Sequence, residues 1–160
     1  RPNSAPHGIK TGSLPGQFNM LYAFGKGEVT VSISGVEADA IVHTIRDVGL
    51  VSKALTELSA GDTVGVRGPF GSAWPIPKSP SHPLVFVAGG LGMAPLRTAV
   101  QAAIQTTRPR KNIFLFYGTR SPDDFLYLSD LQKWENKLQL RTTVDTANTK
   151  WQGLSALSRN

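Results

Sequence analysis

The chain has 160 residues, of which 40% are hydrophobic and 18% charged, a balance typical of soluble globular proteins. It contains no cysteine, which excludes disulfides, thiolate-ligated iron–sulfur clusters and zinc ribbons from this polypeptide. Its three histidines lie far apart in sequence, so we expect no metal site. The net charge is +6, but the basic residues are scattered, so we expect no nucleic-acid binding and consider an anionic ligand or an acidic partner protein instead.

Neither a membrane segment nor a leader stands out. No apolar run approaches the roughly twenty residues that a membrane helix needs, so we expect no membrane span. No charged-then-apolar stretch follows Arg1, so we expect no secretory signal, with a processed or cut N-terminus as the alternative.

The first half of the chain has the texture of short strands. Residues 1–16 are rich in Pro, Gly and Ser and are expected to form a loose lead-in. A short helix is expected to begin with Ser52 as its N-cap and to run to Leu58. Short strands separated by glycine-containing turns predict a small antiparallel β-barrel or sandwich. The predicted strands are Phe18–Ala23, Val29–Ser34, Ala40–Ile45 and Thr63–Arg67.

A proline-rich segment divides the chain. Four prolines fall within residues 74–83, and neither a helix nor a central strand tolerates them. We therefore predict a first domain over residues 1–78 and a second over residues 82–160.

The second half alternates strand-like and helix-like patterns. Leu84–Ala88 is a continuous apolar run, which is typical of a strand buried on both faces of a parallel sheet. Strand–helix alternation predicts βαβ units, so the expected fold class is a partial β-barrel followed by a Rossmann-like parallel α/β half-domain. Residues 151–160 do not continue the pattern. The other predicted elements are helices at Leu96–Ile104 and Leu128–Leu138 and strands at Ile113–Tyr117 and Leu138–Val144.

A glycine-rich turn joins the first of these strands to its helix. Glycine in VFVAGGLGMAPLRTAV allows a phosphate to approach the backbone, and the free N–H groups of a helix start favour an anion. The spacing is close to the dinucleotide fingerprint, but Pro95 replaces its final glycine. The next strand ends Tyr117-Gly118-Thr119-Arg120, without the usual acidic residue for the NAD ribose. Taken alone, the turn also fits a tight connection that binds nothing.

Several motifs in order resemble the ferredoxin-reductase-like superfamily, whose members bind FAD and NAD(P). GGLGMAP and FYGTRSPDDFLYLSDLQKW are similar to its nucleotide domain. PGQFNMLYAFGKGEVTVSIS and HTIRDVGLVSKALTELSAGDTVGVRGPFGSAWPI are similar to its flavin barrel. The resemblance runs from about Pro15 to Trp151 and is nearest to the gamma (diaphorase) subunits of cytoplasmic nickel–iron hydrogenases. Electron-transfer subunits of dihydroorotate dehydrogenase and of anaerobic sulfite reductase are further relatives.

The resemblance implies a set of flavin-binding residues. Ser32 would be the catalytic residue, donating a hydrogen bond beside the flavin N5. The arginine usual in this motif is Val29 here, which would weaken affinity for the flavin phosphate. Two alternatives stay open: His43 also fits a structural role, and Ser52 also fits a simple helix cap. The implied flavin-binding residues are Thr30, Val31, Ser32, His43, Thr44, Ile45, Gly49 and Ser52.

The resemblance also implies residues for the nicotinamide cofactor. One group would cradle the pyrophosphate and a second would lie at the adenosine ribose. Arg120 in the second group could meet a 2′-phosphate, which favours NADP over NAD. Asp123 and Asp124 are interpreted as charges at a helix N-terminus. The first group is Gly90, Gly92, Met93 and Pro95, and the second is Gly118, Thr119 and Arg120.

The function implied is that of a cytoplasmic flavin-dependent oxidoreductase. Such a subunit passes electrons between NAD(P)H, FAD and a metal centre on a partner subunit. In the family the nucleotide domain continues with a Cys-Gly-Pro-Pro loop and a [2Fe–2S] cysteine cluster, so the chain is expected to be a truncated member. The alternative is a non-catalytic nucleotide-binding or assembly module.

Overall fold

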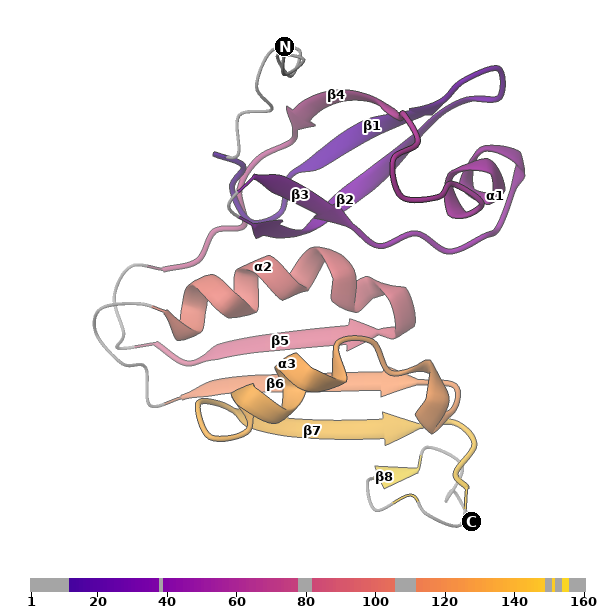
Figure 1. Ribbon diagram of the computed structural model, residues 1–160. Helices are drawn as coiled ribbons and strands as arrows, with labels where there is room; N and C mark the ends of the chain where they lie inside the picture. Colours follow the sequence, from indigo (N-terminus) through magenta and orange to yellow (C-terminus); the bar gives the residue numbers. More distant parts are fainter. Residues whose placement is uncertain are drawn as a thin grey trace. The chain divides into compact units, whose positions relative to one another are not determined.

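The chain divides into two compact units, and the boundary along the sequence lies between Ala73 and Trp74. The computed structural model describes residues 12–37, 39–77, 82–105, 112–148, 151 and 154–155 (Figure 1). Residues 78–81, where we placed the end of the first domain, lie outside the described residues, as does most of the predicted lead-in. Each unit is described by itself.

In its described residues, the first unit forms a four-stranded antiparallel sheet with the order β3-β2-β1-β4. β4 begins and ends two to three residues later than predicted and includes Pro69. Proline is tolerated there because β4 lies at the edge of the sheet. The predicted antiparallel β architecture is confirmed. The strands are β1 (Phe18–Ala23), β2 (Gly27–Glu37), β3 (Ala40–His43) and β4 (Gly65–Phe70).

Helix α1 (Leu50–Thr56) packs its inner face on this sheet. Leu55 is buried with Leu21 and Ala23 of β1, a small core suited to a seven-residue helix. The prediction that Ser52 is the N-cap is wrong. Gly49 is the N-cap, and Ser52 lies in the first turn, from which its side chain reaches back to the Gly49 N–H.

The second unit is a parallel sheet with the order β5-β6-β7-β8. The predicted α/β alternation is confirmed, and α2 begins three residues earlier than predicted because Pro95 fits a first helical turn. A last strand pairs with β7, although no continuation was expected; two residues are too few to produce a sequence pattern. The elements are β5 (Leu84–Gly89), η1 (Gly90–Gly92), α2 (Met93–Ile104), β6 (Ile113–Thr119), η2 (Pro122–Asp124), α3 (Leu128–Trp134), β7 (Gln139–Val144) and β8 (Leu154–Ser155).

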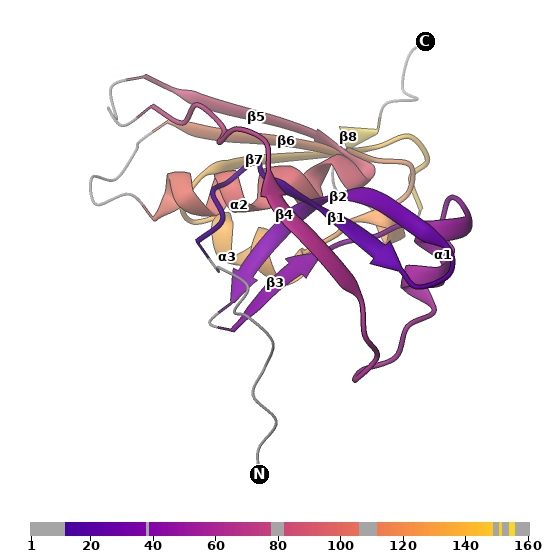
Figure 2. The ribbon, with the colours of Figure 1, turned by 90° about the horizontal axis from the view of Figure 1, so that it is seen from above.

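The two described α-helices of this unit, α2 and α3, cover the same face of the sheet (Figures 1 and 2). The core lies between them and the strands, where Val100 of α2 and Leu115 of β6 are fully buried. On the opposite face Val85 and Val87 of β5 are 58% and 70% exposed. The expectation that β5 is buried on both faces is therefore wrong for the described part of the chain, because its two α-helices lie on one side.

Gly68 of β4 is the position in the first unit where we expect an added methyl group to be most damaging. Its φ is +146°, and a Cβ there would overlap the side-chain oxygen of Asn19. Gly61 is also in the positive-φ region, at +97°, but a Cβ there meets no atom within 4 Å. We expect Gly68→Ala to lower the free energy of unfolding by about 2 kcal/mol and Gly61→Ala by about 1 kcal/mol, measured by urea denaturation. If the two variants lose equal stability, backbone strain alone, and not the contact with Asn19, explains why glycine is needed at position 68.

Candidate functional site

The segment Thr30–Ser32 lies in the middle of β2, opposite β1. Thr30 is exposed, and its hydroxyl lies 3.1 Å from the sulfur of Met20. Ser32 is half-buried, and its hydroxyl has no hydrogen-bond partner among the described residues. The Ser32 hydroxyl is therefore available to a ligand, whereas its carbonyl is already engaged by a neighbouring strand.

That neighbour is His43 at the end of β3, and both of its ring nitrogens are occupied. Nδ1 lies 3.0 Å from the Ser32 carbonyl oxygen and Nε2 lies 3.1 Å from the Asn19 amide nitrogen. A carbonyl only accepts, so Nδ1–H donates to Ser32 and Nε2 accepts from Asn19, which is the neutral form of the ring. Burial lowers the pKa of His43 below its ordinary value, against hydrogen bonds to the Ser32 and Val31 backbone that raise it. This arrangement favours the structural alternative for His43.

The lowered pKa of His43 predicts a pH-dependent stability. His43 binds a proton more readily in the unfolded chain than in the folded one. Its contribution to the free energy of unfolding is therefore complete above about pH 6.5, and it is lost as the pH falls toward the folded-state pKa. We expect the urea midpoint of the wild type to decrease when the pH is lowered from 7.5 to 5. The His43→Gln variant, which cannot titrate, should show a shallower decline. Parallel declines in the two proteins would assign the pH dependence to other groups.

The two residues after β3 make different contacts. The Thr44 hydroxyl is 2.9 Å from that of Ser34, a fully buried residue of β2. Ile45 packs against the small core and lines a cavity of about 360 Å³ beside Leu55. Their predicted contact with a flavin stays a prediction.

The Gly49–Ser52 turn is held by the Ser52 hydroxyl. Its oxygen accepts the N–H of Val48 at 3.0 Å and of Gly49 at 2.9 Å, and the hydroxyl donates to the Gly49 carbonyl at 3.0 Å. Ser52 is only 7% exposed, so its side chain shapes the turn and has no remaining capacity for a phosphate. Gly49 itself has an extended φ of −177°, and no atom lies within 4 Å of a Cβ placed on it.

The glycine-rich turn of the second unit becomes the short 3₁₀ helix η1 and then α2. Gly90 has a φ of +48°, which favours glycine. Gly89 and Gly92 have ordinary φ values of −124° and −59°, and no atom lies within 4 Å of a Cβ on either. The Met93 side chain is fully buried, and its N–H already donates to carbonyls of η1. Of the predicted cradle, Gly92 therefore faces open space and Met93 belongs to the core.

The end of β6 lies beside this turn, because Gly118 is the parallel partner of Gly89. The structure thus brings both predicted nucleotide segments to the carboxyl edge of the sheet, where open α/β sheets bind ligands. Thr119 is buried and its hydroxyl donates to the Ser121 carbonyl at 2.8 Å. Arg120 is exposed and has no acidic partner among the described residues.

The sequence of this chain is similar to those of known oxidoreductases and of electron-transfer subunits. Residues 86–157 match the family described as "Oxidoreductase NAD-binding domain". The chain is 39% identical over 118 residues to sulfhydrogenase 2 subunit gamma of Pyrococcus furiosus, an alignment that covers 73% of this chain and 41% of that protein. It is 31% identical over 125 residues to a probable dihydroorotate dehydrogenase B (NAD(+)) electron transfer subunit of Archaeoglobus fulgidus, covering 78% and 49%. Over these matched residues the chain is similar to the ferredoxin-reductase-like oxidoreductases.

Solved ferredoxin-reductase-like structures share the fold. A cytochrome P450 reductase from Amycolatopsis superposes with a TM-score of 0.76 at 22% identity, over 95% of this chain and 47% of that one. The predicted fold class is confirmed. The chain spans less than half the length of the two relatives and of this structure that it matches.

Two residue pairs that sequence patterns did not indicate involve elements that carry predicted site residues. Asn19 is 1% exposed and pairs with His43 across 24 positions of the sequence. Arg97 of α2 forms an ion pair with Asp130 of α3, with Nε 2.6 Å from Oδ2, and its guanidinium lies 4.7 Å from the ring centre of Tyr127. No local signal could reveal these partners, because each pair is joined only by tertiary packing.

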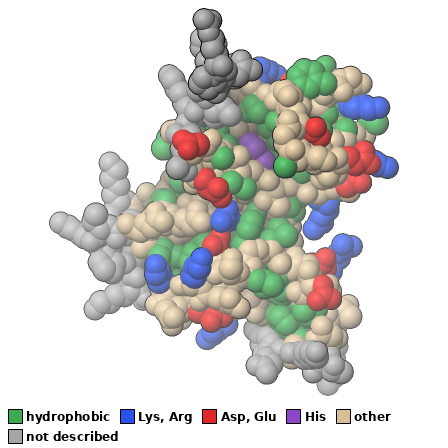
Figure 3. All heavy atoms as spheres, viewed as in Figure 1, with side chains coloured by type: hydrophobic (Ala, Val, Ile, Leu, Met, Phe, Trp, Pro, Cys, Tyr) green, Lys and Arg blue, Asp and Glu red, His purple; other side chains and the backbone are tan. Residues whose placement is uncertain are grey.

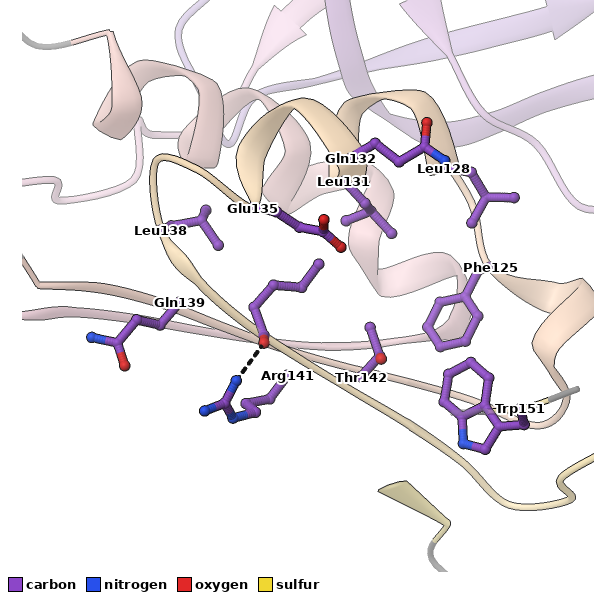
Figure 4. Close-up of a pocket in the computed structure, with 11 residues that line it drawn as sticks. Phe125, Leu128, Leu131, Gln132, Glu135, Leu138, Gln139, Arg141, Thr142 and Trp151 are labelled. Atoms are coloured by element: carbon purple, nitrogen blue, oxygen red, sulfur yellow. Dashed lines mark hydrogen bonds between the residues drawn. The ribbon is translucent and has the colours of Figure 1, made fainter. Parts of the chain in front are cut away.

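A further hollow lies away from the predicted cofactor residues. A groove of about 590 Å³ runs between α3 and β7, and the rings of Phe125 and Trp151 stack at its end with centroids 5.4 Å apart (Figure 4). Arg141 donates to the neighbouring Leu140 carbonyl at 3.2 Å. None of the predicted cofactor residues lines this groove.

The described residues contain no group of three or more His, Asp or Glu side chains able to hold a metal ion. None of the helices in this part of the chain has the length and apolar character needed to cross a membrane. On the face seen in Figure 3, the Lys and Arg side chains are spread out and mixed with acidic ones.

Proposed function

We propose that this chain is the flavin- and nucleotide-binding part of an electron-transfer subunit, which passes electrons between NAD(P)H, FAD and a partner metalloenzyme such as nickel–iron hydrogenase. The observation that carries the proposal is a set of glycines that the fold itself does not require. Gly49, Gly89 and Gly92 have ordinary φ values, and a Cβ on any of them would meet open space. A ligand that approaches the backbone explains why no side chain stands there.

In the first unit the proposed site fits a flavin. When bound, a flavin accepts an electron pair from reduced nicotinamide and releases electrons singly. The unpartnered Ser32 hydroxyl would hydrogen-bond the flavin, with the backbone of Thr30 and Val31 along the ring. Gly49, in a turn shaped by Ser52, leaves room for the phosphate side of the cofactor.

In the second unit the proposed site fits a dinucleotide. Gly90 and Gly92 would receive the pyrophosphate, and the first turn of α2 supplies a favourable dipole. The exposed Arg120 guanidinium at the end of β6 would accept the 2′-phosphate of NADP in a forked geometry.

The proposed partners and location follow from the relatives. Both relatives named above are subunits by name, of a sulfhydrogenase and of a dihydroorotate dehydrogenase. We therefore propose further subunits that carry the metal centre to which the electrons pass. A cytoplasmic location is part of the same proposal.

A non-catalytic nucleotide-binding or assembly module is the second candidate. The observation that favours it is Val29, which stands where the flavin motif has an arginine for the phosphate. The two candidates differ in turnover and agree on nucleotide binding.

The deciding experiment is the visible absorption spectrum of the purified chain after incubation with excess FAD and removal of free cofactor. A retained, shifted flavin band, followed by NADPH oxidation with ferricyanide as acceptor, supports the oxidoreductase. The Gly49→Val variant tests the site itself. Extended backbone accepts valine, so this variant should stay folded by circular dichroism yet lose the flavin absorption band. A folded but colourless wild type that still binds NADP⁺ would favour the non-catalytic module.

A further inference from the structure

Tyr117 links the glycine-rich turn of the proposed nucleotide site to the loop before α3. Its side chain is fully buried within β6. Its hydroxyl donates to the Gly90 carbonyl at 3.1 Å and accepts the N–H of Leu126 at 3.1 Å. These partners lie 27 positions before it and 9 positions after it, so one oxygen atom links the glycine-rich turn to the loop that leads into α3.

Both linked segments carry unusual backbone. Gly90 has a φ of +48°, and Tyr127, which directly follows Leu126, has a φ of +58°, an uncommon value for a residue with a side chain. Glycine adopts such a conformation freely, whereas a residue with a side chain persists in it only where its surroundings hold it. The Tyr117 hydroxyl bonds to Gly90 itself and to the neighbour of Tyr127, so it is placed to hold both.

We propose that Tyr117 is a positioning residue of the nucleotide site, whose hydroxyl fixes the glycine-rich turn in the shape that receives a pyrophosphate. The inference rests on the proposed function of this turn and adds to it a residue that makes no contact with the ligand. Without the hydroxyl, the Gly90 carbonyl and the Leu126 N–H lose a buried partner, and the turn samples other shapes. Binding then includes the cost of ordering the turn, and affinity falls by the fraction of time spent in other shapes.

The test is the Kd of ADP-ribose, which carries the pyrophosphate and needs no flavin, measured by titration calorimetry. We expect Tyr117→Phe to raise the Kd about tenfold, the equivalent of one lost net hydrogen bond. Two control variants should stay within about twofold of the wild type. Tyr22→Phe makes the same change at a partly exposed ring of β1. Phe125→Leu removes the ring that packs edge-on against Tyr117 at 5.0 Å and keeps the hydroxyl.

Each outcome decides the proposal. An unchanged Kd in Tyr117→Phe overturns it, and so does an equal loss in Phe125→Leu, because packing and not the hydroxyl would then be responsible. Failure of the wild type to bind ADP-ribose instead refutes the nucleotide site itself. Should Tyr117→Phe not fold, amide exchange in the wild type decides: ADP-ribose should slow exchange at Leu126, and unchanged exchange there overturns the proposal.

Discussion

Replacing Gly92 with alanine is expected to weaken ADP-ribose binding by about two orders of magnitude without loss of stability. At a φ of −59° alanine fits the backbone, and its Cβ meets no atom of the described chain within 4 Å. The free energy of unfolding should stay equal or rise by about 0.5 kcal/mol, since alanine restricts the unfolded chain. The methyl group would stand where the pyrophosphate approaches the turn, so two charge-assisted hydrogen bonds are lost or lengthened.

The measurement pairs titration calorimetry with urea denaturation on the same preparations. Gly61→Ala is the matched control because it makes the same chemical change at a turn of the first unit with a φ of +97°. That variant should lose stability and keep its affinity, the reverse of the pattern at Gly92. If Gly92→Ala binds ADP-ribose as tightly as the wild type, the pyrophosphate does not lie at this turn.

The largest stability effect is expected at the ion pair between α2 and α3. Arg97 and Asp130 are 19% and 16% exposed, and their Nε and Oδ2 atoms are 2.6 Å apart. Asp130→Ala leaves the Arg97 guanidinium largely desolvated without its counter-charge. We expect the free energy of unfolding to fall by about 3 kcal/mol, the cost of breaking a buried pair on one side only. The urea midpoint at constant slope measures this loss.

The contrast is the exposed pair Lys53–Glu57 of α1. Its charged atoms are 3.8 Å apart and its side chains are 60% and 64% exposed, so Glu57→Ala should cost less than about 0.5 kcal/mol. Replacing both buried partners, as Arg97→Met with Asp130→Leu, should recover most of the loss. A loss below about 1 kcal/mol for Asp130→Ala would show that water reaches the pair and screens it.

Periodicity and turn chemistry predicted most of the elements. β1 was predicted at its observed bounds because alternation between two glycine-containing turns is a local signal. The order of β5, α2, β6, α3 and β7 followed from strand–helix alternation. Boundaries were less accurate: α3 ends at Trp134, four residues before the predicted end, although the apolar spacing continues to Leu138. Burial of Leu138 after the helix end accounts for that spacing.

The candidate sites were predicted as segments and not as contacts. Their glycines could be predicted from the sequence because a glycine-rich turn is recognised from residue identity alone. The sequence could not separate Gly90, whose φ requires glycine, from Gly92, which the fold leaves free. Nor could it reveal that the Ser52 hydroxyl is occupied by the backbone, while that of Ser32 has no partner in the described part of the chain.

By itself, the sequence determined the architecture, the family resemblance and the positions of the two candidate cofactor segments, because these depend on local spacing along the chain. Tertiary structure alone decided which side chains meet. Gly89 and Gly118 come together through the parallel register of β5 and β6. Tyr117 reaches Gly90, and Arg97 reaches Asp130, because α2 and α3 pack on one face of that sheet. Such contacts join residues roughly thirty positions apart, and no local pattern encodes them.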